Sequence, residues 1–249
     1  MSPRSQRAAI RRVGAPAEPI ASGDDTQARV LTAASELFAA HGFARTTIRE
    51  IAERAGVNVA AGHYHFGSKR ELYLAVARAQ FDTLDARIAS ANADVEEGAL
   101  DGLSRAALGA LLGRRIHAML AFLLGPPPSP HGAIMLGELS HPTDALPVIV
   151  REYVRPQQQR VVAIIARLAP SLDARAIQQC CFSIVSQVFF QRLMLPAMPD
   201  LMGVAALPRD HVRRTAEHIT AFALAAITGL ERASRAARAP TPARENRKR

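Results

Sequence analysis

The chain has 249 residues, of which 49% are hydrophobic and 21% charged, and its formal net charge is +9. This length suits one large domain or two small ones, and the apolar content is too high for a disordered chain. Two adjacent cysteines, Cys180 and Cys181, cannot build a disulfide framework and suit a reducing compartment. No secretory signal is expected, nor an apolar run of the roughly 20 residues that a membrane span needs. The composition therefore predicts a cytoplasmic protein that does not cross a membrane.

The basic excess lies mainly at the two ends of the chain. Residues 1–24 carry a net charge of +2 and residues 235–249 a net charge of +5, so seven of the nine excess charges lie there. Such ends are either solvated or attract DNA phosphates without sequence preference. We expect a flexible basic leader over residues 1–24 and a basic tail over residues 239–249.

From Thr26 onward the apolar residues recur with a helical period, and no alternating run long enough for a strand occurs. The pattern predicts a first helix over residues 26–40, stopped by Gly42. Further downstream it predicts helices over residues 102–124 and 133–140, separated by a proline-rich loop. A last helix before the C-terminal pair should reach Leu168 with a kink at Pro156.

Between the first helix and residue 73 the chain carries two capping boxes. Thr47 with Glu50, and Ser68 with Glu71, have the spacing at which a hydroxyl and a carboxylate each meet a free backbone amide at a helix start. A short helix ended by Gly56 and a third helical segment of six or seven residues lie between them. Two short helices joined by a tight turn, with longer helices on either side, are typical of a helix-turn-helix.

The two C-terminal helices, expected over residues 173–195 and 209–238, each carry an apolar stripe whose positions alternate by four and three. Helices pack side by side along such stripes. The stripes serve either a bundle within one chain or, as we favour, a homodimer through a four-helix bundle with two helices from each subunit. The expected dimer contacts are Ile177, Cys181, Ile184, Val188, Val212, Ala216, Ile219, Ala223 and Ala226.

The stretch TTIREIAERAGVNVAAGHYHFGSKRELY at residues 46–73, preceded by FAAHGF at residues 38–43, resembles the DNA-binding domain of TetR/AcrR-family regulators. The stretch GELSHPTDAL at residues 137–146, with Arg155 and Pro156, resembles the branch with a CecR-type C-terminal domain. The resemblance implies an all-α fold. A three-helix DNA-binding domain with the helix-turn-helix, residues 25–85, would precede a larger helical ligand-binding and dimerisation domain, residues 86–238.

The resemblance also implies that the helix starting at Asn58 enters the major groove of a palindromic double-stranded DNA operator. Residues expected near base edges are Asn58, Val59, Ala60, Ala61 and His63, and residues expected on phosphates are Thr47, Arg49, Tyr64, His65 and Lys69. An unidentified small, apolar effector would bind the C-terminal domain and release the DNA by linkage. Its expected pocket lies between the helices at residues 102–124, 133–140 and 144–168. The candidate lining residues, of which most could equally be core, are Leu112, Ile116, Met119, Leu120, Met135 and Leu139.

Other classes of function have less support in the sequence. There is no phosphate-binding glycine loop or nucleophile elbow, so an enzyme is not expected, and no cofactor is implied. Glu138 and His141 lack a third ligand, so a metal site is not expected. The alternative is a helical dimerisation or scaffold protein with a degenerate helix-turn-helix. Gly62 stands where the family usually has Leu or Ile, and residues 25–85 carry seven basic and seven acidic side chains.

Overall fold

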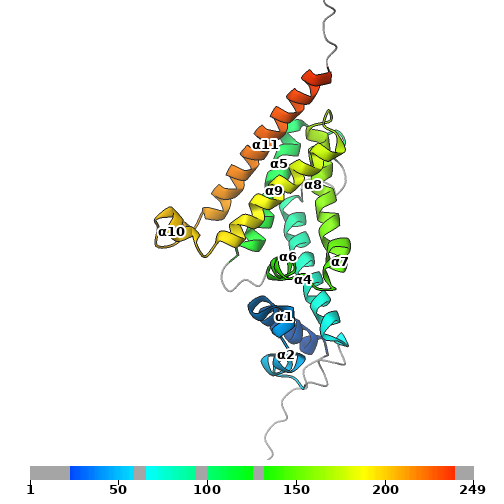
Figure 1. Cartoon of the computed structure of the whole chain (residues 1–249), viewed down its shortest axis with the longest axis vertical. Coiled ribbons are helices and arrows are strands. Elements are labelled where there is room, and N and C mark those ends of the chain that lie inside the picture. The colour runs from blue at the N-terminus through cyan, green and yellow to red at the C-terminus, as the bar shows by residue number, and fades with distance from the viewer. Residues whose placement is uncertain (1–22, 59–65, 94–99, 126–131, 239–249) are drawn as a thin grey trace, which may run out of the picture.

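The computed structural model describes residues 23–58, 66–93, 100–125 and 132–238. Every regular element within these ranges is a helix, so the all-α class expected from the sequence is confirmed (Figure 1). The elements are α1 (Gly23–Arg45), α2 (Ile48–Ala55), α4 (Lys69–Ala91), α5 (Arg105–Leu123), α6 (Ala133–Ser140), α7 (Leu146–Ile149), the π-helix η1 (Val150–Val154), α8 (Arg155–Leu168), α9 (Ala174–Met194), α10 (Met198–Met202) and α11 (His211–Arg238).

The N-terminal helices follow the expected signals, with small shifts at their ends. α1 begins at Gly23, three residues earlier than expected, and its helical geometry breaks at Gly42, where φ is 74° and ψ is 171°. Both predicted capping boxes form, at Thr47 before α2 and at Ser68 before α4. Gly56 ends α2 in the left-handed conformation, as expected of a glycine C-cap.

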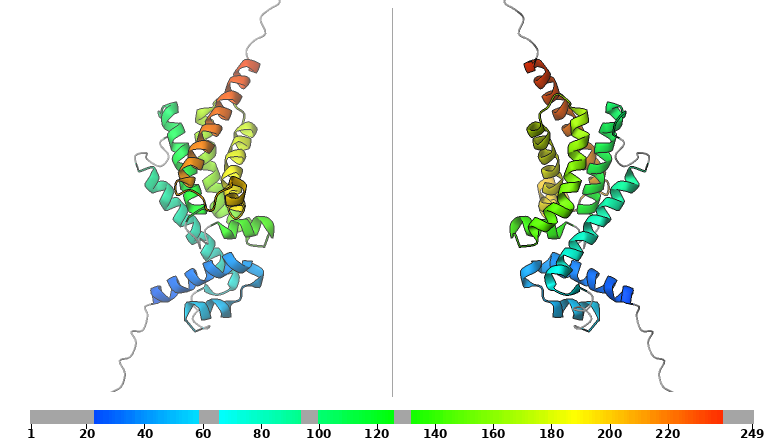
Figure 2. Two further views of the ribbon diagram at one scale, coloured as in Figure 1. Left: turned by 90° about the vertical axis from the view of Figure 1, so that its left-hand side faces the viewer. Right: turned by 90° about the vertical axis from the view of Figure 1, so that its right-hand side faces the viewer.

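The apolar interior consists of two clusters. The first joins α1, α2 and the start of α4 to α6 and α7, through residues such as Phe38, Ile51 and Ile134. The second lies among α5, α8, α9, α11 and the end of α4. In Figure 2 the pair α1 and α2 lies at one end of the molecule, and α4 runs from it into the larger bundle. α4 therefore belongs to both clusters, with Tyr73 and Val76 buried in the first and Leu84 and Ile88 in the second.

The helix expected up to Leu168 forms as a continuous run from α7 through η1 to α8. Its irregularity lies in η1, directly before Pro156, where the Arg155 amide bonds back to the carbonyl of Val150. Proline has no amide hydrogen and crowds the preceding turn, so a wider turn at this place has a local cause. The kink expected at Pro156 thus takes the form of a π turn.

α5 is the central helix of the second cluster. It is long and apolar enough to cross a membrane by length and composition alone. However, Leu112, Ile116 and Leu120 are almost completely buried against the neighbouring helices. Burial of this kind is what the core helix of a globular domain requires.

The stripes on α9 and α11 point into their own chain, which corrects the expected dimer contacts. Seven of the nine residues belong to the second apolar cluster, namely Ile177, Cys181, Ile184, Val188, Ala216, Ile219 and Ala223. Val212 packs against that cluster, and Ala226 is exposed. A four-three stripe has the same form for helices of one chain and of two, so the spacing could not decide between them.

A different face of α9 and α11 is exposed and apolar. Large side chains on it include Phe182, Phe190, Leu193, Phe222 and Leu230, with exposed fractions between 47% and 63%. We call these five residues the outer apolar face. Large exposed apolar side chains on two neighbouring helices are a candidate interaction site.

Candidate nucleic-acid interface and effector cleft

The helix-turn-helix is framed by the two capping boxes. The Thr47 hydroxyl accepts from the Glu50 amide at 3.2 Å, and the Glu50 carboxylate accepts from the Thr47 amide at 2.8 Å. The Thr47 hydroxyl also donates to the Glu50 carboxylate at 2.9 Å, and the bonds that this carboxylate accepts, first the one from the Thr47 backbone, lower the pKa of Glu50. Ser68 and Glu71 repeat the arrangement at the start of α4, with distances of 3.1 and 2.8 Å. The two boxes thereby fix the residues at which α2 and α4 begin.

Arg29 of α1 holds the turn after α2. Its Nη2 atom donates to the carbonyl of Ala55 and, at 2.9 Å, to that of Gly56. φ at Gly56 is +64°, so the turn favours glycine, and a Cβ atom there would lie 2.8 Å from the same nitrogen and displace the end of the Arg29 side chain. The sequence alone gave no reason to select Arg29, because its partners are backbone carbonyls more than 25 positions away.

Four of the expected DNA contacts lie in the described residues. Thr47, Arg49 and Asn58 are exposed, and Arg49 forms an ion pair with Glu53 at 2.9 Å. Lys69 is half-buried, with its ammonium 4.4 Å from the ring centre of Phe43. The other expected contacts lie outside the described residues, namely Val59, Ala60, Ala61, His63, Tyr64 and His65.

The predicted effector pocket is corrected by the structure. Leu112, Ile116 and Leu120 are at most 1% exposed and fill the second apolar cluster, whereas Leu139 is 62% exposed on α6. Met119 and Met135 line a separate cavity of only about 40 Å³. Apolar residues at helical spacing pack in a core and line a pocket equally well, so the pattern could not separate the two roles.

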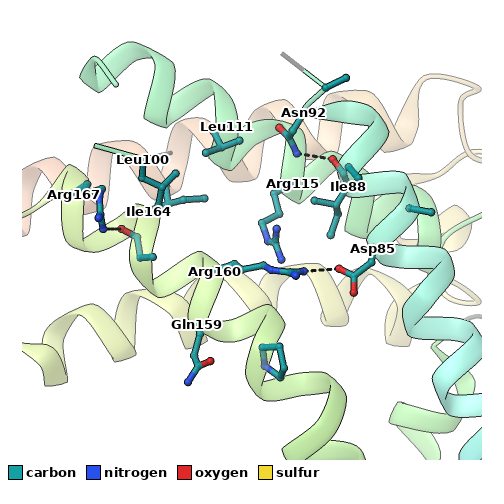
Figure 3. Close-up of a pocket in the computed structure, with 15 residues that line it drawn as sticks. Asp85, Ile88, Asn92, Leu100, Leu111, Arg115, Gln159, Arg160, Ile164 and Arg167 are labelled. Carbon is teal, nitrogen blue, oxygen red and sulfur yellow. Dashed lines mark hydrogen bonds and ion pairs between the residues drawn. The ribbon is translucent and has the colours of Figure 1, made fainter. Parts of the chain in front are cut away.

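A much larger cleft, of about 790 Å³, lies between α4, α5 and α8. Its apolar lining residues include Ile88, Leu100, Leu111 and Ile164 (Figure 3). This volume is within the range of about 300–1,000 Å³ that is usual for small-molecule sites. The cleft shares α5 and α8 with the predicted pocket but has α4 where α6 was expected.

Polar side chains tie α4 to α8 beside this cleft, and of these Asp85 and Arg160 line it. The Asp85 carboxylate on α4 accepts from Arg160 at 2.6 Å and from Gln157 at 2.5 Å, both on α8. Gln157 in turn accepts from Arg115 of α5, which is 6% exposed. We call Asp85, Arg115, Gln157 and Arg160 the Asp85 cluster. The sequence signal that could have found it is Arg115, a charged residue within the apolar stripe of its helix.

A second tie lies at the other end of α4. Glu138 of α6 is fully buried and accepts from the Thr143 amide at 2.9 Å and the Thr143 hydroxyl at 2.7 Å. Burial, together with a hydrogen bond to Glu138, raises the pKa of Tyr73 on α4. We call Tyr73, Glu138 and Thr143 the Glu138 cluster. It accounts for Glu138 without a metal, and no group of three potential ligands is placed to hold a metal ion in the described part of the chain.

The two cysteines are buried free thiols. Burial raises the pKa of Cys181 to about 11. A thiol with so high a pKa is almost wholly protonated near neutral pH and reacts slowly. Cys181 is therefore a packing residue of the second apolar cluster and not a reactive thiol.

Two family descriptions match the chain. Residues 30–76 match bacterial regulatory proteins of the tetR family, and residues 108–227 match the C-terminal domain of the HTH-type transcriptional dual regulator CecR. The chain belongs to the TetR family, whose members are transcriptional regulators and not enzymes. Within that family, its larger domain is of the CecR type.

Curated relatives match a limited part of the chain. The chain is 44% identical over 61 residues to the HTH-type transcriptional activator FasR of Mycolicibacterium smegmatis, covering 24% of this chain and 28% of that protein. It is 46% identical over 56 residues to CecR of Shigella flexneri, covering 22% and 25%. The chain thus spans little more than a quarter of these relatives' length.

Solved structures match over most of the chain. A transcriptional regulator from Pseudomonas aeruginosa PAO1 is 20% identical, with a TM-score of 0.60 over 88% of this chain and 96% of that one. The fatty acid degradation regulator FadR from Bacillus halodurans is 13% identical, with a TM-score of 0.59 over 79% and 97%. At such identities the likeness establishes the shared fold.

Proposed function

We propose that the chain is a cytoplasmic, homodimeric transcriptional regulator of repressor type. It would bind a palindromic DNA operator and release it when a small molecule with an apolar body occupies the C-terminal domain. The observation that carries the proposal is the frame of two capping boxes around the segment that follows Gly56. Thr47, Arg49 and Asn58 lie exposed on this frame, where a helix-turn-helix meets DNA.

DNA binding is tested by a gel shift with the DNA upstream of the protein's own gene, titrated with salt. Because phosphate contacts release counterions, log affinity should fall steeply with log salt. Arg49→Gln should weaken binding to all sequences and reduce the slope by about 1 if Arg49 contacts a phosphate. Arg151→Gln is the matched control, since Arg151 is also exposed and ion-paired but lies in η1. Binding that ignores both salt and sequence would favour the scaffold alternative.

Dimer formation is proposed through the outer apolar face. Two copies joined face to face would present two reading heads, as half-sites about 34–36 Å apart require. Phe222→Glu should convert the dimer to a monomer in light scattering, because a carboxylate would be buried at the contact. Leu139→Glu is the control, since Leu139 is similarly exposed (62% against 57%) but lies on α6. A dimer that survives Phe222→Glu would contradict this interface.

A further inference from the structure

The connection between α9 and α11 is unusually apolar for a segment at the surface. Between Arg192 and Arg209 the sequence has sixteen residues, and Asp200 is the only one of them with a charged or polar side chain. A surface connection usually carries several polar turn residues, such as Asn, Asp and Ser. Here the middle of the connection forms α10, which ends at Gly203 with a φ of +65°. The segment is therefore an ordered, apolar element at the surface.

The end of α10 exposes large apolar side chains to solvent. Leu201 is 72% exposed, Met202 52% and Val204 37%, whereas Met198 at the start of α10 is buried. We call Leu201, Met202 and Val204 the α10 tip. In Figure 1 α10 stands out from the bundle, to one side of the adjoining ends of α9 and α11. Exposed apolar side chains gathered in this way are a candidate interaction site.

The α10 tip continues the outer apolar face. The end of α9 carries Phe190 and Leu193 of that face, and α10 follows after residues 195–197. Between Arg192 and Arg209 the chain carries no positive charge, so this segment has nothing with which to attract DNA or an anionic membrane. A second copy of this chain, which carries the same apolar face, is the partner that suits the tip best.

The outer apolar face alone is small for a stable dimer contact. A fully buried aromatic side chain covers about 150–250 Å², so five side chains that are about half exposed offer on the order of 500 Å². A specific, stable interface needs about 800 Å² from each partner. The three exposed side chains of the α10 tip enlarge the apolar surface toward that size.

From these observations we infer that the α10 tip packs on the partner subunit and completes the dimer contact that begins on the outer apolar face. In a two-fold dimer each subunit gives one tip and receives one, so the contact is made twice. Leu201, the most exposed of the three side chains, becomes buried there. The inference rests on the proposed homodimer and goes beyond it, because it gives α10 a role in the assembly.

Leu201→Glu tests this contact by sedimentation velocity on the full chain. We expect the dissociation constant of the dimer to rise at least tenfold, because a carboxylate would be buried in both symmetric contacts. Leu201→Met keeps an apolar side chain of similar volume and should leave the constant unchanged. Leu139→Glu is the control at an exposed position on α6. Circular dichroism checks that each variant is folded. An unchanged dissociation constant for Leu201→Glu would overturn the inference.

A photo-reactive residue identifies the partner of the tip. Benzoylphenylalanine in place of Leu201 should give a covalent product of twice the chain's mass after irradiation, and in place of Leu139 it should give none. A product of single-chain mass alone, or no product from a dimeric chain, would contradict the inference. In that case Phe222→Glu would still separate the subunits if the outer apolar face is the dimer contact. A failure of the α10 contact is therefore distinguishable from a failure of the proposed dimer.

Discussion

The Glu138 cluster and the Asp85 cluster both tie α4 to the C-terminal domain, but they differ in their access to water. Glu138 is fully buried, and its described partners, Thr143 and Tyr73, both donate to it. Asp85 and Arg160 have side chains that are 43% and 40% exposed and line an open cleft. A buried, satisfied network rigidifies its surroundings, whereas an accessible ion pair contributes little and is easily exchanged. α4 is therefore held firmly at its N-terminal part, next to the helix-turn-helix, and more weakly near its C-terminal end.

The largest effect should come from breaking the buried cluster. Glu138→Ala leaves the amide and hydroxyl of Thr143 and the hydroxyl of Tyr73 without their acceptor. We expect the free energy of unfolding to fall by about 3 kcal/mol, since each buried donor left unsatisfied costs about 1–3 kcal/mol. Urea unfolding followed by circular dichroism measures it, with the exposed Glu152→Ala as control. A loss no greater than that of Glu152→Ala would show that the cluster is not a rigid tie.

High pH should weaken the same cluster. The pKa of Tyr73 is raised in the folded chain, so folding favours its protonated form. The stabilisation is fully present below about pH 10, where an unfolded tyrosine titrates, and is lost as the pH rises above it. Tyr73→Phe should cost about 1 kcal/mol at pH 7 through the lost hydrogen bond. The variant should then lose less stability than the wild type between pH 9.5 and 11. Identical slopes in urea unfolding would contradict this assignment.

Removing the carboxylate of the Asp85 cluster should affect stability much less. Asp85→Ala breaks a pair that is about two-fifths exposed, so we expect a loss of about 1 kcal/mol or less. Urea unfolding of this variant beside Glu138→Ala measures the difference. A loss as large as that of Glu138→Ala would remove the contrast between the two clusters.

The smallest effect should come from Arg167, which lines the same cleft. Arg167 pairs with an almost fully exposed Asp101, so Arg167→Gln should change stability by less than about 0.5 kcal/mol. Urea unfolding under the same conditions measures it. A loss larger than that of Asp85→Ala would contradict this ranking of the ion pairs by exposure.

Local signals in the sequence predicted several helix starts and ends, although not the short helix α10. Thr47 with Glu50 and Ser68 with Glu71 predicted two helix starts correctly, because a capping box forms within four consecutive residues. Gly56 predicted the end of α2 correctly, because a glycine C-cap is also a local signal. Pro156 indicated an irregular turn, although not that it would be a π turn. The family resemblance supplied the arrangement of these helices.

Relations between distant residues could not be predicted in the same way. Ile184 and Val188 form a clear stripe, but which helix covers it depends on the whole bundle. Leu112 and Leu120 could be core or pocket lining, and only their neighbours decide. The Asp85 cluster joins positions 85, 115, 157 and 160 from three helices, so its partners share no sequence spacing.

The most direct test of the account is the operator affinity of the wild type and of Phe222→Glu, measured by fluorescence anisotropy at several salt concentrations. The account predicts that the wild type binds the operator with a steep dependence on salt, because phosphate contacts release counterions. Phe222→Glu should bind at least tenfold more weakly, because a monomer engages one half-site at a time. Wild-type binding that ignores salt and sequence, or an equal affinity of a variant shown to be monomeric, would contradict the account.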